Sequence, residues 1–436
     1  MHDVLDDRDL VPDEAEQLLH SGHPAGPLLA EARTAAAAAD YPRLVALGEL
    51  LAALPVQRDW PYDEADDDAT LGALADALPA LPVDRTGENG GLADRIHGAW
   101  LGRCVANTMG KPVEGLTRDE VGRYLRAVGQ WPQTGYLPLL ADLPEGVSHL
   151  HESAPFASAG TFADVPRDDD LDWTILGLWM LEEYGAALTT ADVARSWLDR
   201  LPFTQTFTAE RAAYRNIVRG VPVDQAAIVR NPYREWIGAL IRADIFGYVH
   251  PGRPGEAARA AVVDARLSHV ANGVLGEVWA AALVAAALAS DTARAALDVA
   301  ARAVPARSRL GEALTAVLAL HADGGTADQA LAWVDERLGH YNWVHTVNNA
   351  ALISIGLLWG EDFTTSVALT ISGGRDTDSS AATVGSVYGA LHGVRSIPAD
   401  LVGATHVRVR SAVRDFDRVE IAELARRTLA VEEALR

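Results

Sequence analysis

Cysteine is almost absent from this chain of 436 residues, in which Cys104 is the single example. One cysteine excludes a disulfide within the chain and a zinc site built from several of its own thiolates. Cys104 lies in a stretch of small apolar residues. We therefore expect a buried apolar side chain there, not a nucleophile or a metal ligand.

Positive charge is also scarce. The chain has 37 Lys and Arg against 60 Asp and Glu, for a formal charge of -23. Such an excess of negative charge repels phosphate backbones and argues against a general nucleic-acid partner. The acidic start lacks the basic and then apolar order of a secretory signal, and the most apolar run, VWAAALVAAALA from Val278, is too short to span a bilayer. We expect a cytoplasmic protein without a membrane partner, and the sequence leaves its oligomeric state open.

The chain does contain many segments with the sequence pattern of helices. Hydrophobic residues make up 49% and charged residues 22%, which is ordinary for a globular protein. Segments such as AALVAAALASDTARAALDVAARAV are dominated by alanine and leucine, while alternating strand patterns are rare. The sequence predicts an all-α fold. Turn-forming residues near DRTGENGG further predict a helical N-terminal extension over residues 1–93 and a main domain over 94–436.

The main domain opens with IHGAWLGRCVANTMGKPVEG, in which small residues recur every fourth position from Gly98 to Gly110. This spacing places them on one helix face, where a second backbone can approach closely. Pro112 ends the helix, and Glu114 follows just beyond it.

A run of aspartates, RDDDLDWT, precedes an apolar and tryptophan-rich helix. One aspartate at a helix N-terminus is favoured by the free N–H groups and the dipole. Asp168, Asp169 and Asp170 in succession repel one another, and burial of the helix removes the screening by water, so we expect a cation beside them. The similar run DEADDDAT at 63–70 precedes a helix with a narrower apolar face, and we expect only a solvated cap there.

A third motif, ISGGRDTDSS, places Asp376 and Asp378 two residues apart with Ser379 adjacent. Carboxylate and hydroxyl oxygens are hard ligands that suit Mg²⁺ or Mn²⁺ better than zinc. Together with residues 168–170, this motif supplies enough oxygens for two hard cations.

Taken together and in this order, the three motifs resemble those of the ADP-ribosylglycohydrolase family, over about residues 95 to 395. The resemblance implies a compact all-α fold with two Mg²⁺ or Mn²⁺ ions at the base of a cleft. It implies that Glu114 lies near the metals and, with Asp169 and Asp170, takes part in catalysis. The implied metal ligands are Asp169, Asp170, Asp376, Asp378 and Ser379, and Asp168, which stands where the family has threonine, is a further candidate ligand.

The expected substrate contacts rest on fewer signals. Asn107 stands where the family often has aspartate, and Gly374 and Arg375 adjoin the third motif, where the arginine would meet either a phosphate or solvent. A helix-entry cluster contributes Trp343, His345 and Asn349, with His345 equally suited to capping the helix.

Three functions fit these residues. The first is metal-dependent hydrolysis of an ADP-ribosyl bond on a protein or a small molecule, in which the metals position the attacking water. The second is cleavage of another ribosylated small metabolite, as an N-glycosidase or a related hydrolase. The third is a catalytically silent binding or structural protein with this fold, against which the retention of four core aspartates argues.

Overall fold

The computed structural model describes residues 5–87 and 91–436. The all-α prediction is confirmed, because the regular secondary structure of the described residues is helical apart from two short paired strands, β1 (Arg408–Val409) and β2 (Val419–Glu420). Residues 1–4 and 88–90 of the predicted N-terminal extension lie outside the described part. No helix in the described ranges has the length and apolar character needed to cross a membrane.

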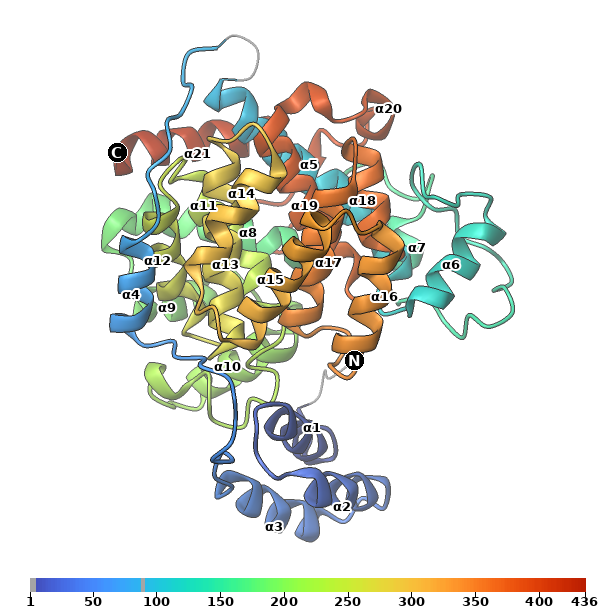
Figure 1. The fold of residues 1–436 in the computed structure, drawn as a ribbon, viewed down its shortest axis with the longest axis vertical. Coiled ribbons are helices and arrows are strands. Elements are labelled where there is room, and N and C mark those ends of the chain that lie inside the picture. Colours follow the sequence, from blue (N-terminus) through green and yellow to red (C-terminus); the bar gives the residue numbers. More distant parts are fainter. Residues whose placement is uncertain (1–4, 88–90) are drawn as a thin grey trace.

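The centre of the main body is made of long helices that are buried over most of their residues (Figure 1). They are α5 (Leu92–Gly110), α8 (Asp169–Tyr184), α13 (Asn272–Ala287), α17 (Thr346–Trp359) and α19 (Thr377–His392). α13 is alanine-rich and buried along its whole length, so its small side chains let neighbours approach from every direction. Cys104 on α5 is also buried, as predicted, and burial raises the pKa of its thiol to about 12.

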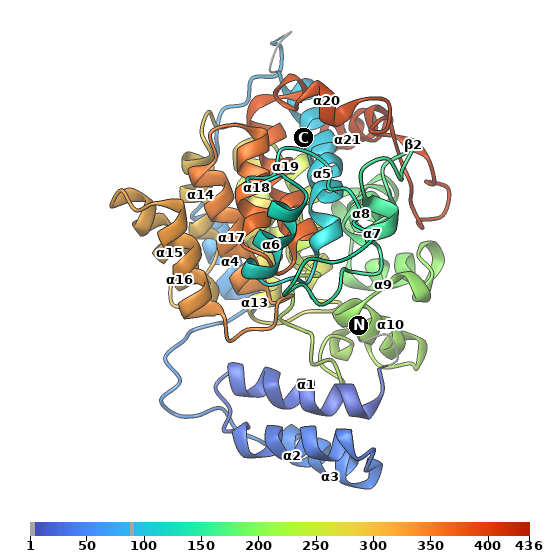
Figure 2. The same ribbon diagram turned by 90° about the vertical axis from the view of Figure 1, so that its right-hand side faces the viewer.

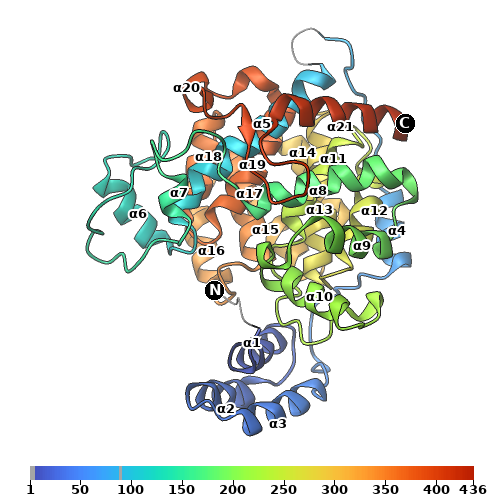
Figure 3. The same cartoon turned by 180° about the vertical axis from the view of Figure 1, so that it is seen from behind.

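The remaining helices of the main body surround this centre. On one side α21 (Ile421–Leu435) lies across α5 and α8, which is visible from behind (Figure 3). The other covering helices are α6 (Arg118–Ala127), α7 (Ala154–Ala157), α9 (Thr190–Arg200), α10 (Thr208–Val218), α11 (Asp244–Tyr248), α12 (Pro254–Ala265), α14 (Ala293–Ala300), α15 (Arg309–Ala322), α16 (Ala327–Leu338), α18 (Phe363–Ser372) and α20 (Ala399–Val402).

The closest helix pair is α5 with α19, and glycine makes it possible. A Cβ on Gly102 would lie 2.1 Å from the carbonyl oxygen of Gly385, and one on Gly110 would lie 2.4 Å from that of Thr377. Neither position has room for a side chain. The small-residue spacing in the first motif therefore serves a backbone-to-backbone contact, as expected, and brings the end of α5 against the start of α19.

The N-terminal helices α1 (Asp7–His20), α2 (Gly26–Ala37) and α3 (Tyr41–Ala52) form a separate bundle beside the main body (Figure 2). They enclose a hydrophobic cluster of their own, which includes Leu44 and Leu47. α1 also contacts the body, where Leu10 joins a small cluster with Tyr233 and Trp236. The predicted boundary after residue 93 falls in the first turn of α5 and stays a prediction.

A long connection leads from this bundle to α4 (Asp68–Asp76), which packs on α12. The second aspartate run lies at its start. Asp67 caps the helix by accepting from the N–H groups of Ala69 and Thr70, as expected. Asp68 is exposed and paired with Arg266, and Asp66 accepts from the N–H of Ala271. This run thus caps α4 and ties it to the body.

Candidate metal centre

The aspartates at the start of α8 have different partners. Asp168 is the N-cap, and its Oδ1 accepts from the backbone N–H of Asp170 at 3.1 Å. Asp170 is buried, whereas Asp169 is partly exposed at the wall of a cavity. Asp172 faces away from the cavity wall and has structural partners, an ion pair with Arg167 at 2.7 Å and a hydrogen bond from the hydroxyl of Ser411 at 2.6 Å.

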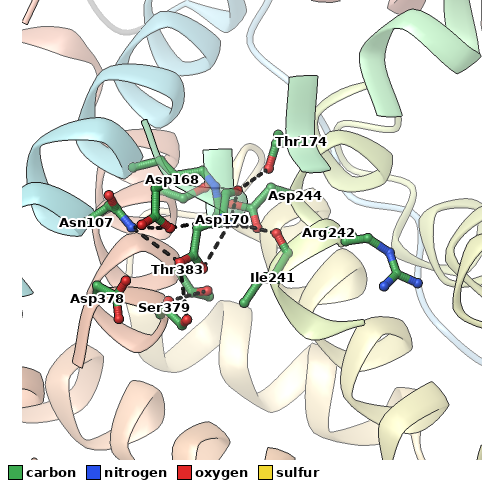
Figure 4. Close-up of polar contacts among 12 residues, drawn as sticks. Asn107, Asp168, Asp170, Thr174, Ile241, Arg242, Asp244, Asp378, Ser379 and Thr383 are labelled. Carbon is green, nitrogen blue, oxygen red and sulfur yellow. Dashed lines mark hydrogen bonds and ion pairs between the residues drawn. The ribbon is translucent and has the colours of Figure 1, made fainter. Parts of the chain in front are cut away.

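The other half of the site comes from α19 and from η1 (Lys111–Val113), a 3₁₀ turn that continues α5. Asp376 and Asp378 are buried at the start of α19, and Glu114 follows η1. The hydroxyl of Ser379 donates to Asp170 Oδ2 at 3.2 Å, which links the two halves (Figure 4).

These carboxylates form two overlapping groups close enough to share a metal ion. One group contains Glu114, Asp376 and Asp378, and the other contains Asp168, Asp170 and Asp378. Within each group, one oxygen per residue lies within 4.8 Å of the others. Asp378 belongs to both groups and is their common point.

A lysine lies between the two groups. The Lys111 ammonium is 2.7 Å from Glu114 Oε2, 2.6 Å from Asp168 Oδ2 and 2.7 Å from Asp378 Oδ2. Glu114 also lies 3.1 Å from His151 Nδ1. The ammonium is the closest positive charge to these three carboxylates in the described structure.

The pKa values show that this one lysine does not balance the cluster. Burial, reinforced by neighbouring carboxylates, raises the pKa of Asp170 and of Asp376 well above the ordinary range for aspartate. Burial also raises the pKa of Asp169 to about 7, with Asp168 as the second cause. Burial opposes ionisation of Asp168 as well, but Lys111 brings its pKa below the usual value. The protein alone therefore favours protons on several of these carboxyls, as expected where positive charge is too low.

Two buried side chains of α5, those of Arg103 and Asn107, contact the start of α8. Arg103 of α5 pairs with Asp244 at 3.0 Å and donates to the backbone carbonyls of Asp170 at 2.8 Å and Ile241 at 2.6 Å. Asn107 donates from Nδ2 to Asp168 Oδ1 and Asp170 Oδ2, both at 3.3 Å (Figure 4). Both side chains fix the first turn of α8 against α5.

The carboxylates open into a cavity of about 470 Å³. Its lining includes the aromatic residues Phe207, Trp236 and Trp343 together with the carboxylates. A space of this size with aromatic walls and a few converging polar groups is typical of a small-molecule site. The segment that carries Trp236 is fixed by a backbone hydrogen bond from the N–H of Ile237 to the carbonyl of Val344 at 2.9 Å.

Several predicted substrate contacts lie away from this cavity. His345 caps α17 by accepting from the N–H of Val347, and Asn349 donates to the carbonyls of Trp343 and His345. Asn349 thus holds the backbone of Trp343 in place. Arg375 pairs with Asp335 outside the cavity lining, and Gly374 forms a tight turn with φ of 68° against the backbone around Thr117. Of the predicted substrate residues, Trp343 lines the cavity and Asn107 contacts the aspartates.

Two residues of the site were missed by the sequence reasoning. The motif analysis assigns no role to Lys111, although the composition contains a signal, because Lys111 is the only lysine in the chain. His151 lies in a loop that the sequence shows to be irregular and histidine-containing. No spacing rule would have paired it with Glu114, since the contact depends on how that loop folds over η1.

Comparison with known proteins agrees with the motifs. The family model described as ADP-ribosylglycohydrolase matches residues 88–435. An uncharacterised protein of Archaeoglobus fulgidus is 23% identical over 300 residues, which cover 69% of this chain and 88% of that protein. A solved structure titled ADP-ribosylglycohydrolase-related protein complex aligns with 79% of this chain and 99% of its own at 20% identity and a TM-score of 0.43. Because the family model covers most of the sequence, the chain belongs to the ADP-ribosylglycohydrolase family.

Proposed function

We propose that this protein is a metal-dependent hydrolase that cleaves a ribosyl glycosidic bond, with ADP-ribosyl groups on proteins or small molecules as the substrates suggested by its family. The observation that carries the proposal is the pair of carboxylate groups sharing Asp378 at the wall of an aromatic-lined cavity. The indoles of Trp236 and Trp343 provide flat apolar surfaces for a base or another aromatic leaving group.

The residues present suit a hard divalent cation. Asp170 Oδ1 and Asp378 Oδ1 are buried and accept no hydrogen bond from the described residues. An unsatisfied buried carboxylate oxygen is costly, and a cation removes that cost. Every candidate ligand is an oxygen, which favours Mg²⁺ or Mn²⁺ over softer metals. When bound, such an ion would hold ribose hydroxyls and lower the pKa of a water molecule.

The side chains divide the remaining work between them. Hydrolysis of a ribosyl bond passes through an oxocarbenium-like state, which nearby negative charge stabilises. Asp170, Asp376 and Asp378 provide that charge on one side of the cavity. Asp169 lines the cavity and is partly exposed, so its carboxylate is placed to accept the proton of the attacking water. Glu114, fixed by Lys111 and His151, would orient that water.

Chelation provides the direct test. Activity against an ADP-ribosylated peptide or arginine should disappear after exhaustive EDTA treatment and return with Mg²⁺ or Mn²⁺. Asp376→Ala should reduce metal occupancy and turnover together. Full activity in metal-free protein would refute the proposal, and so would an Asp376→Ala variant that loses its metal but keeps turnover.

The charge of the cavity favours a second candidate, the hydrolysis of a ribosylated small metabolite whose leaving group is uncharged or cationic. Among the described residues, the lining contains seven carboxylate side chains, namely Glu114, Glu152, Asp169, Asp170, Glu210, Asp376 and Asp378. Lys111 is the one Lys or Arg side chain in that lining, and three carboxylates already surround it. A diphosphate would meet no guanidinium in this described lining, although Arg is well suited to phosphate recognition.

A substrate pair separates the two candidates. Release of the base from a pyridinium N-riboside and release of ADP-ribose from an ADP-ribosylated peptide can be followed by liquid chromatography with the same metal-loaded protein. Faster turnover of the riboside would support the second candidate. Turnover of the ADP-ribosylated peptide alone would exclude it and leave the first.

A further inference from the structure

Lys111 is the only lysine in a chain with 36 arginines. Everywhere else, positive side-chain charge comes from arginine. The two residues are not equivalent, because arginine presents a planar fork of five donors and lysine a compact ammonium with three. A single lysine in such a composition marks a position where a point charge fits and a guanidinium does not.

The surroundings of Lys111 match this requirement. Three carboxylate oxygens from three separate elements lie within 2.7 Å of Nζ, contributed by Glu114, Asp168 and Asp378. The side chain is buried, and the backbone at Gly110 lies against Thr377, immediately before Asp378. The lysine is therefore held at the centre of the cluster by a close backbone contact between the end of α5 and the start of α19.

Lys111 also explains the unusual residue at position 168. The family resemblance leads one to expect threonine there, and Asp168 adds a negative charge instead. Its Oδ2 is the oxygen nearest to the ammonium, at 2.6 Å. The negative charge of the extra carboxylate and the positive charge of the lysine thus cancel, so the pair adds no net charge to the site.

We propose that Lys111 is a resident cation that takes the place of one of two divalent ions, so that the site binds a single metal ion. This proposal rests on the metal-dependent function proposed above. Ions in two-metal sites lie about 3.5–4 Å apart and share ligands. The ammonium already contacts Asp378, the residue common to both carboxylate groups, and uses one further carboxylate from each group.

The ligands left for the metal are those that Lys111 does not contact. They are Asp170 from one carboxylate group and Asp376 from the other, together with Asp378 Oδ1, since Asp378 belongs to both groups, and the hydroxyl of Ser379. Asp170 Oδ1 and Asp378 Oδ1 are the buried oxygens that accept no hydrogen bond from the described residues. Asp378 together with the remaining carboxylate of one group can hold one hard cation that also keeps water molecules in its coordination shell.

Metal stoichiometry tests the proposal. Equilibrium dialysis against Mn²⁺ followed by elemental analysis should find one ion per chain in the wild type and two in Lys111→Met. The double variant Lys111→Met with Asp168→Thr, which removes the charge pair together, should also bind two. Two ions in the wild type, or one in Lys111→Met, would overturn the resident-cation proposal and leave the metal-dependent function intact. No ion in the wild type would overturn both.

A second measurement does not depend on variants of Lys111. The amine reagent acetyl N-hydroxysuccinimide ester, read by peptide mass spectrometry, should leave Lys111 unmodified with and without Mn²⁺. Arg395→Lys adds an exposed amine far from the site and serves as the positive control for labelling. Modification of Lys111 that requires Mn²⁺ would show that the metal displaces the ammonium, and would overturn the proposal.

Discussion

Replacing Gly102 with alanine should damage the metal centre more than the fold. The new Cβ would lie 2.1 Å from the Gly385 carbonyl oxygen, whereas ordinary contact begins near 3.4 Å. The helices α5 and α19 must therefore move apart by about 1 Å at this point. Overpacking of this kind costs about 1–3 kcal/mol, and the better helix propensity of alanine returns at most about 1 kcal/mol.

The thermal effect of that cost is small in a chain of this size. Unfolding entropy of about 2.1 cal/mol/K per residue, over 436 residues, converts a loss of 1–3 kcal/mol into a fall in Tm of about 1–3 °C. The functional effect should be larger, because α5 leads into Glu114 and the candidate ligands Asp376 and Asp378 lie at the start of α19. A displacement of about 1 Å at a site can cost about 100-fold in rate.

We therefore expect Gly102→Ala to reduce turnover by about 10- to 100-fold and to weaken Mn²⁺ binding in isothermal titration calorimetry. Gly72→Ala is the matched control, since Gly72 lies within helix α4 and a Cβ there meets nothing within 4 Å. The free energy of unfolding of that variant should rise by up to about 1 kcal/mol, and its metal affinity should equal that of the wild type. If Gly102→Ala bound Mn²⁺ and turned over substrate like the control, the α5–α19 contact would not determine the geometry of the site.

Three further predictions concern individual side chains. Asp378→Asn removes the carboxylate common to both groups, so Mn²⁺ binding should fall by more than about 100-fold by calorimetry, and retained affinity would exclude Asp378 as a ligand. Arg103→Met leaves Asp244 buried without its partner and should cost about 3–5 kcal/mol in urea unfolding, whereas a cost below about 1 kcal/mol would contradict the role of the pair. Burial lowers the pKa of His345 to about 3 from an unfolded value of 6.5, so its contribution to stability is present above pH 6.5 and is lost as the pH falls toward 3. The loss for one such group is at most about 1.4 kcal/mol per pH unit. His345→Asn keeps a capping side chain and should show a shallower fall in unfolding free energy between pH 6.5 and 5. Burial also lowers the pKa values of His20 to about 4 and of His406 to about 3. Both residues remain in this variant, so part of the pH dependence of the unfolding free energy should remain. An unchanged slope in His345→Asn would mean that His345 does not contribute.

The fold was accessible from sequence because its signals are local. Alanine-rich apolar segments predict buried helices, and α13 and α17 are such helices. The regular small residues from Gly98 to Gly110 predict a close backbone contact, but not its partner. That partner is α19, more than 260 residues later, and only tertiary packing brings the two together.

The substrate-facing residues were harder to predict for a related reason. The spacing of His345 and Asn349 correctly places them next to each other, and Asn349 donates to the carbonyl of His345 at 2.9 Å. Spacing along a helix does not tell which face looks into a cavity. In the structure that face turns toward the protein interior, and it is Trp343, one turn before the helix, that reaches the lining.

The two aspartate runs show how one local rule leads to two different outcomes. Both runs cap a helix, with Asp67 accepting from the N–H groups that follow it and Asp168 accepting from that of Asp170. Capping therefore does not distinguish a site from a solvated helix end. At position 168 the cap occupies Oδ1 and fixes the side chain, which leaves Oδ2 pointing at Lys111. Asp168 is thus an ordinary N-cap by its Oδ1 hydrogen bond. What distinguishes it from Asp67 is the ion pair of its Oδ2 with Lys111, which lies just after the end of α5.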